Sequence, residues 1–453
     1  MMITKKGGIT MWALFHKRQI SSSQIILLGF ALVIALGALV LMLPVSSREG
    51  TATSFLDCLF TSTSAVCVTG LVVYDTTIHW SVFGQAVILL LIQIGGMGVV
   101  TVAAAIAMAS GKRISLMQRS TMQDAISAHH VGGIVRFTGF ILKGIFFIEL
   151  LGATVLMAIF VPEYGLKGIW LGIFHSISAF CNAGFDLMGT NSPYSSLTAY
   201  ADHAVVNITI MLLIVIGGIG FLTWQDIREN GFHIRRYRMQ SKVILASTSV
   251  LLLVPALYFF FFEFSAEPMG RRILLSAFQS VTPRTAGFNT ADLTALSETG
   301  QTITIGLMLI GGSPGSTAGG MKTTTIAVLL ACTVAVFRKR ENGRFFGRRI
   351  ADETVKNAIA VLLMYLTLFL LGGMVISRIE DLPMLTCLFE TASAIGTVGL
   401  TLGITPSLHT VSRLILISLM FLGRVGGLTL IFATLSANKN TLSRLPLEKI
   451  TVG

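Results

Sequence analysis

Two short motifs each occur four times in this chain, in the same order and at similar spacing. The first motif occurs as FLDCLFTSTSAVCVTGL (55–71), IWLGIFHSISAFCNAGF (169–185), RILLSAFQSVTPRTAGF (272–288) and MLTCLFETASAIGTVGL (384–400). The second occurs as LIQIGGMGVVT (91–101), LIVIGGIGFLT (213–223), LMLIGGSPGST (307–317) and LMFLGRVGGLT (419–429). The last Gly of the first motif precedes the first Gly of the second by 25, 33, 24 and 24 residues. Repetition of this kind predicts four copies of one supersecondary unit.

The chain also has eight long apolar runs, two for each copy of the motifs. They cover about 24–44, 82–108, 134–160, 202–224, 242–263, 300–336, 356–377 and 411–435. Each is long enough to cross a hydrocarbon core of about 30 Å. Hydrophobic residues make up 53% of the 453 residues and charged residues only 12%, about half of what a soluble domain carries. This composition argues against a soluble enzyme and against a nucleic-acid-binding protein, despite the net charge of +12.

Each repeat is therefore interpreted as a first span, a shorter segment that enters the membrane and returns, and a second span. Because each unit contains two spans, all four units have the same orientation, whereas the inverted repeats of carriers alternate. We expect an all-α integral membrane protein in which four such units surround a pore with approximate fourfold symmetry. The expected segments are an N-terminal tail (1–22), the repeats 23–112, 130–228, 240–338 and 353–436, and a C-terminal tail (437–453).

Lys and Arg are concentrated in five of the segments outside the apolar runs. These segments are the N-terminal tail, the loops near 112, at 225–242 and at 338–356, and the C-terminal tail, and all fall on one side of the expected topology. By the positive-inside rule this side is cytoplasmic, so we expect a multi-pass cell-membrane protein with both termini in the cytoplasm. The run Arg235–Arg238 is interpreted mainly as part of this signal; contact with anionic membrane lipids or with a regulatory partner is the alternative.

The Gly near the end of each first motif suggests ion binding. A selectivity filter replaces the water around an ion with backbone carbonyl oxygens. Directing successive carbonyls the same way requires unusual backbone angles, and Gly adopts them at little cost. The short helix before each Gly would direct its partly negative C-terminus at the ion; plain C-terminal helix caps are the alternative. The candidate ion-binding residues are Val68, Thr69, Gly70, Leu71, Asn182, Ala183, Gly184, Phe185, Thr285, Ala286, Gly287, Phe288, Thr397, Val398, Gly399 and Leu400.

With these four loops, the chain resembles the Trk/Ktr/HKT superfamily of potassium transporters, and most of all the membrane subunits of bacterial Ktr uptake systems. The resemblance covers the chain from about residue 20 to its end. It implies four helix–pore loop–helix units in one subunit, a homodimer with one pore per subunit, and regulation by a cytoplasmic nucleotide-binding ring of RCK domains. It also implies K⁺ as the ion at the filter carbonyls, uptake that Na⁺ stimulates, and no cofactor in this chain.

The second span of the third repeat is interrupted by GGSPGSTAGG (311–320). Five Gly and one Pro cannot continue a stable helix. The resemblance implies that 311–325 is an intramembrane loop that gates the pore. Its candidate gate residues are Gly311, Gly312, Ser313, Pro314, Gly315, Ser316, Thr317, Ala318, Gly319, Gly320 and Lys322. Two of its glycines have the spacing of a nucleotide-binding P-loop, but Met321 precedes the Lys and no strand precedes the segment, which argues against an ATPase.

Arg424 stands where the other three repeats have Gly96, Gly218 and Gly312. An Arg at membrane depth costs several kcal/mol unless it faces water or a partner. One interpretation is a salt bridge between helices, with Asp57 and Glu390 as candidate partners. The other is a cationic barrier just below the filter, and the resemblance implies a pore Arg at this position.

We expect channel-like permeation and no enzymatic activity. A carrier with its site at the broken helix is the main alternative. A membrane-embedded enzyme would need a nucleotide domain or a paired acid–base motif, and the sequence shows neither. His175 is interpreted as a packing residue, a metal site at His129–His130 is not favoured, and five Cys without a CxxC pair argue against a zinc site.

Overall fold

The structure is a computed structural model that describes residues 21–110, 116–126, 133–190, 192–427 and 429. This part of the chain is largely helical. Its helices are α1 (Ser22–Leu41), α2 (Phe55–Val66), α3 (Thr76–His79), α4 (Val82–Met97), α5 (Val99–Ala109), α6 (Leu116–Ile126), α7 (Ile134–Tyr164), α8 (Lys167–Phe180), α9 (Ala204–Gly218), α10 (Phe221–Asn230), α11 (Met239–Tyr258), α12 (Met269–Val281), α13 (Glu298–Leu309), α14 (Thr323–Phe337), α15 (Asp352–Glu380), α16 (Met384–Gly396) and α17 (Thr410–Val425). A hairpin of β1 (Arg344–Phe345) and β2 (Arg348–Arg349) connects α14 to α15.

The helices follow the four repeats of the sequence. Each repeat has a long first helix (α1, α7, α11 or α15), a short helix over the first motif (α2, α8, α12 or α16) and a second helix that reaches the second motif (α4, α9, α13 or α17). Among the described residues four helices are long and apolar enough to cross a membrane, and six if each bent pair counts as one span. The expectation of eight full-length spans is therefore confirmed only in part.

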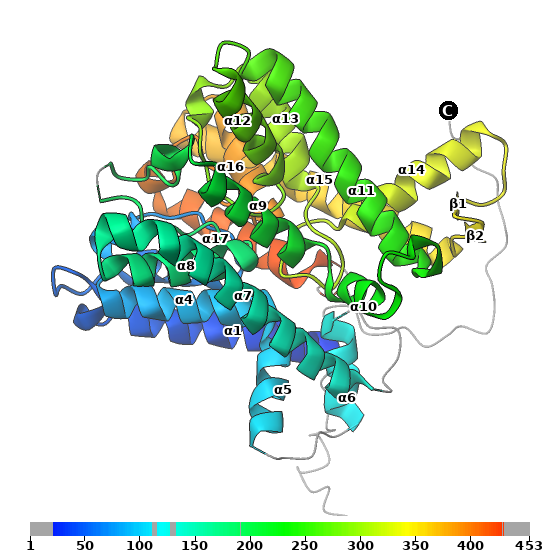
Figure 1. The fold of residues 1–453 in the computed structure, drawn as a ribbon, viewed down its shortest axis with the longest axis horizontal. Helices are drawn as coiled ribbons and strands as arrows, with labels where there is room; N and C mark the ends of the chain where they lie inside the picture. Colours follow the sequence, from blue (N-terminus) through cyan, green and yellow to red (C-terminus); the bar gives the residue numbers. More distant parts are fainter. Residues whose placement is uncertain (1–20, 111–115, 127–132, 191, 428, 430–453) are drawn as a thin grey trace, which may run out of the picture.

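The second helices of the first two repeats are bent, which the sequence interpretation did not predict. The axis turns by 95° between α4 and α5 and by 96° between α9 and α10. The turns lie at Gly98 and Gly220, whose φ angles of +83° and +90° end the preceding helix. The apolar runs 82–108 and 202–224 therefore each form two helices at nearly a right angle instead of one straight helix, and α5 projects from the bundle together with α6 (Figure 1).

The repeats contact one another in a cyclic order. The second helix of each repeat packs on the short helix of the next: α4 contacts α8, α9 contacts α12 and α13 contacts α16. The fourth repeat returns to the first, because α17 contacts α2. Figure 1 shows the same neighbourhoods, with α4 beside α8 and α13 beside α16. The four short helices are consequently enclosed by the longer ones.

Burial differs sharply between the short and the long helices. In α16, every residue from Phe389 to Gly396 is buried. The first helix of the chain instead exposes Leu28, Leu32 and Leu36, which recur every four residues along one face. An apolar outer face of this kind suits contact with lipid, while the interior holds the segments that follow the short helices.

Candidate functional site

The four loops after the short helices share one unusual backbone conformation. In each loop the Gly has a positive φ, at +93° for Gly70, +69° for Gly184, +82° for Gly287 and +98° for Gly399. The residue two positions earlier also has a positive φ, in Val68, Asn182, Thr285 and Thr397. Left-handed backbone is rare outside Gly and is costly for a β-branched residue. Strain repeated at four equivalent positions points to a functional backbone geometry.

The sequence predicted the glycines and the residues two positions before them as filter residues, but it did not predict the left-handed backbone of the latter. The residue between the two left-handed positions is not left-handed in any of the four loops. An alternation of this kind turns successive carbonyl groups toward the same side of the chain. Carbonyl oxygens aligned in this way are what a filter for a dehydrated cation needs.

The four glycines lie against one another in the order of the repeats. A Cβ placed on Gly70 would lie 2.5 Å from the carbonyl oxygen of Ala183, in the second loop. One placed on Gly184 would lie 2.8 Å from that of Ala286, in the third loop. The remaining contacts complete the cycle, because Gly287 faces the carbonyl of Val398 and Gly399 faces that of Thr69. All sixteen predicted filter residues are buried and belong to these four loops.

Hydroxyl groups of the short helices hold the loops in place. The amides of Gly70 and Gly399 each donate to a Ser Oγ, of Ser64 and Ser393 respectively, at 3.0 Å. In the second loop, Ser178 donates to the carbonyl of Phe185 at 2.7 Å. The third loop uses Thr282 for the same purpose, one position later, and its hydroxyl donates to the Phe288 carbonyl. Each loop is thereby tied to the helix that precedes it.

The glycines of the second motif permit a close approach to the short helices. Gly95 lies against the carbonyl of Val66, and Gly217 and Gly423 lie in the same way against the carbonyls of Phe180 and Ile395. A side chain at any of these positions would overlap that carbonyl. In the third repeat Gly311 meets the carbonyl of Gly319 instead, because the chain folds back on itself there.

That folded-back segment, residues 310–322, lies between α13 and α14 and has no helical residues. Thr317 donates from its amide to the Gly217 carbonyl at 3.2 Å and from its hydroxyl to the Phe180 carbonyl at 3.0 Å. Gly319 is pressed against the side chain of Thr397. The segment therefore contacts the second and the fourth repeats, which are opposite each other in the cyclic order.

Arg424 is bound by backbone carbonyls rather than by a carboxylate. Its guanidinium donates to Thr317 in the folded-back segment, to Gly95, and to Gly96 at 3.3 Å. Lys322 has a similar environment, because its Nζ donates to Ala318 at 2.8 Å and to Gly319 at 3.2 Å. Both cations line a cavity of about 310 Å³ beside the segment. The structure thus does not support the salt-bridge interpretation of Arg424.

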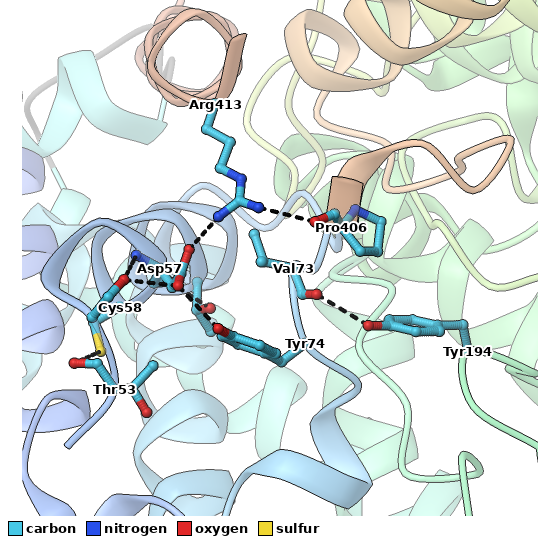
Figure 2. Close-up of polar contacts among 10 residues, drawn as sticks. Thr53, Asp57, Cys58, Val73, Tyr74, Tyr194, Pro406 and Arg413 are labelled. Atoms are coloured by element: carbon cyan, nitrogen blue, oxygen red, sulfur yellow. Dashed lines mark hydrogen bonds and ion pairs between the residues drawn. The ribbon is translucent and has the colours of Figure 1, made fainter. Parts of the chain in front are cut away.

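The two proposed counter-charges have other partners. Asp57 forms an ion pair with Arg413 of α17 at 2.5 Å, and it also accepts a hydrogen bond from Tyr74 at 3.1 Å (Figure 2). Arg413 further donates to the Pro406 carbonyl at 2.9 Å. Glu390 accepts hydrogen bonds from Thr401 and Thr405. The Asp57–Arg413 pair could not be predicted from the sequence, because its members are 356 residues apart.

Another buried polar contact was also missed. Glu149 of α7 accepts two hydrogen bonds from the Gln93 amide of α4, at 3.0 and 3.1 Å, and so joins the first two repeats.

His175 is completely buried, with Nδ1 bonded to the Leu171 carbonyl and Nε2 accepting from the Leu187 amide. This environment is that of a packing residue, as predicted. His129–His130 and the two predicted tails lie outside the described residues, apart from positions 21 and 22.

Comparisons with known proteins point to one family. The family model described as cation transport protein, TrkH, matches residues 19–441. The chain is 39% identical over 450 residues to the potassium/sodium uptake protein NtpJ of Enterococcus hirae, covering 96% of this chain and 98% of that protein. It is 37% identical to the Ktr system potassium uptake protein B of Bacillus subtilis, with 100% of both chains covered.

A solved structure shares the fold. The crystal structure of the potassium transporter TrkH from Vibrio parahaemolyticus matches 93% of this chain and 86% of that chain, with a TM-score of 0.72 and 20% sequence identity. The likeness thus extends across nearly all of the helices described above.

Proposed function

This chain belongs to the TrkH family of cation transport proteins, and on this premise we propose that it is the ion-translocating subunit of a potassium uptake system. Relatives that align over nearly the whole chain are named for potassium uptake. The observation that carries the proposal is the cycle of four glycines, each against a carbonyl of the next loop. The family transports ions and is not a family of enzymes.

The proposed pathway is a pore with approximate fourfold symmetry, formed by the four repeats of one chain. The cyclic packing of second helices on short helices supports this arrangement. K⁺ would lose its water among the carbonyls of the four loops, where the aligned oxygens replace the hydration shell. The C-termini of the four short helices carry partial negative charge and would favour a cation at the same place. The membrane potential would drive uptake by about 2.3 kcal/mol per charge per 100 mV.

Below the filter, residues 311–325 would act as the gate. The proposal is supported by the contacts of this segment with two opposite repeats, because a segment that crosses a pore obstructs it. Arg424 would add a cationic barrier at the same level, and its hydrogen bond to Thr317 would couple the barrier to the gate. Lys322 would strengthen the barrier, since it too lines the cavity there.

The remaining features of the proposal concern topology and partners. Repeats 23–112, 130–228, 240–338 and 353–436 would each start and end in the cytoplasm, and both termini would be cytoplasmic in a multi-pass membrane protein. The concentration of Lys and Arg in the loops at 225–242 and 338–356 supports this orientation.

A relative named as part of a Ktr system supports a companion regulatory subunit. We propose that this subunit is a cytoplasmic nucleotide-binding ring, that the chain forms a homodimer, and that Na⁺ stimulates uptake.

The proposal is tested by expression in bacteria that lack their own K⁺ uptake systems, together with the cytoplasmic partner. We expect growth at low external K⁺ and uptake that prefers K⁺ to Na⁺. Absence of K⁺ uptake from a correctly inserted chain would refute the function. A carrier with a site at the broken third repeat is the alternative mechanism; purely saturable exchange without single-channel current would favour it over a pore.

A further inference from the structure

Two aligned positions around the filter loops carry very different side chains in the four repeats. Three residues before the Gly, the repeats have Cys67, Cys181, Arg284 and Gly396. Nine residues before the Gly, they have Thr61, His175, Phe278 and Glu390. The third repeat therefore places a cation, and the fourth an acid, at positions where the other repeats have none.

The charge of Arg284 is buried and poorly compensated. Arg284 directly precedes Thr285 of the third filter loop in the sequence, and it is only 6% exposed. Nη2 donates to Thr248 Oγ1 at the long distance of 3.4 Å. Among the described residues, Nε has no hydrogen-bond partner and no carboxylate forms an ion pair with this guanidinium.

The surroundings of Arg284 leave little room for another partner. A void of about 10 Å³ lies beside it, lined also by Asn182, Gly218 and Gly312. That volume is close to the minimum for one water molecule. An uncompensated guanidinium in such a place acts over a longer range than one in water, because the effective dielectric constant of the protein is lower. It therefore opposes a cation in the neighbouring filter.

Glu390 has the opposite charge and lies behind the fourth filter loop. It is fully buried in α16 and accepts hydrogen bonds from Thr401 Oγ1 at 2.8 Å and from Thr405 Oγ1. Thr401 follows Gly399 by two residues, so this carboxylate is hydrogen-bonded to the loop segment that leaves the filter. In the described part of the chain no Lys, Arg or His forms an ion pair with it.

We propose that Arg284 and Glu390 together determine how strongly the filter holds its ion, without either side chain touching the ion. Arg284 weakens cation occupancy and Glu390 strengthens it, so the pair sets the balance between tight binding and fast release that conduction requires. A unit charge about 10 Å from an ion, at an effective dielectric constant of 20, changes the binding constant of that ion by roughly tenfold. The inference rests on the proposed potassium transport function.

The test measures K⁺ uptake by the full chain with its cytoplasmic partner, in cells without other K⁺ uptake systems. Flux is normalised to the amount of folded protein in the membrane. Arg284→Gln and Arg284→Met should each lower the KM for external K⁺ by at least about threefold, and Glu390→Gln should raise it by a similar factor. The double variant Arg284→Gln/Glu390→Gln should return toward the wild-type KM. Arg284→Lys and Glu390→Asp keep the charges and should stay near wild type.

Arg271→Gln and Glu267→Gln serve as controls for the loss of a charge. These two residues form an ion pair outside the filter, with side chains 40% and 37% exposed, and water screens their fields. Unchanged KM in these controls is expected. Shifts in the same direction for the Arg284 and Glu390 variants would indicate a purely structural role and overturn the inference, as would unchanged KM in both. A wild-type chain without K⁺ uptake would instead refute the proposed function itself.

Discussion

At the scale of single residues, Gly70 and its three equivalents combine a positive φ with a contact that leaves no space for Cβ. Replacing Gly70, Gly184, Gly287 or Gly399 by Ser should lower the preference for K⁺ over Na⁺. The added Cβ at Gly70 would have to displace the Ala183 carbonyl, which is 2.5 Å away. We expect a loss of about tenfold in K⁺/Na⁺ preference, equivalent to about 1.4 kcal/mol, measured as competitive uptake of the two ions.

Gly403→Ser is a matched control for this prediction. Gly403 has φ = +92°, close to the +93° of Gly70, but a Cβ there would meet nothing within 4 Å. The control therefore carries the same backbone penalty without the steric overlap, and it should keep wild-type ion preference. Wild-type preference in all four filter variants would show that the glycines do not form the filter.

Arg424 provides the second prediction at this scale. Arg424→Gln removes a charge from the cavity and weakens the tie to Thr317, so K⁺ flux per folded molecule should rise. A barrier lower by about 1.4 kcal/mol would raise the flux about tenfold. Arg424→Lys retains the charge and should behave more like wild type, although it cannot reproduce the forked contact. Normal folding with unaltered flux in Arg424→Gln would remove this residue from the conduction path.

At the scale of elements, all four second helices end within the second motif, but the third is interrupted over the longest stretch. In the other repeats the break is a single left-handed Gly: Gly98, Gly220 or Gly426, with ψ angles of 135°, 141° and 139°. In the third repeat, residues 310–322 fold under the loops instead. A Gly-rich second motif is therefore followed by two different structures: a bend at a single Gly, or a long non-helical segment. The difference is the number of residues between the end of one helix and the start of the next.

Deleting residues 314–319 should open the pathway, because the segment then cannot reach the Phe180 and Gly217 carbonyls. We expect a higher K⁺ flux that depends less on the cytoplasmic partner. Thr317→Val, which removes one tether and keeps the length, should raise flux by a smaller amount, since a single hydrogen bond contributes about 1 kcal/mol. Uptake measured with and without the partner provides the test, and unchanged flux in a correctly inserted deletion variant would argue against gating.

At the scale of the whole molecule, the first and last repeats are joined at Asp57 and Arg413 (Figure 2). Asp57→Asn should destabilise the folded chain by about 3 kcal/mol, because it leaves a largely buried guanidinium without its carboxylate. The comparison is Asp202→Asn, whose pair with Arg271 is well exposed and should contribute less than about 1 kcal/mol. Unfolding of the purified protein in detergent measures both. Equal losses of unfolding free energy in the two variants would show that the Asp57–Arg413 pair does not stabilise the contact between the first and last repeats more than a surface pair does.

Much of the fold was predictable from the sequence because it depends on neighbouring residues. Apolar runs specify helices that can span a membrane, and the four copies of each motif specify four similar units. Glycine positions indicated the four loops, since only Gly accepts positive φ without strain. The left-handed Val68 was not predictable in this way, because its own preference opposes that conformation and only the surrounding packing imposes it.

Tertiary structure decided which distant groups meet. The sequence left Arg424 with carboxylate candidates, yet the folded chain surrounds it with the carbonyls of Thr317, Gly95 and Gly96. It likewise could not pair Asp57 with Arg413 across 356 residues. Local preference extends over a few residues, whereas these contacts depend on how the four units close into a cycle. The sequence by itself therefore determined the repeating unit and its glycines, and only the closed assembly of units determined the partners of the buried charges.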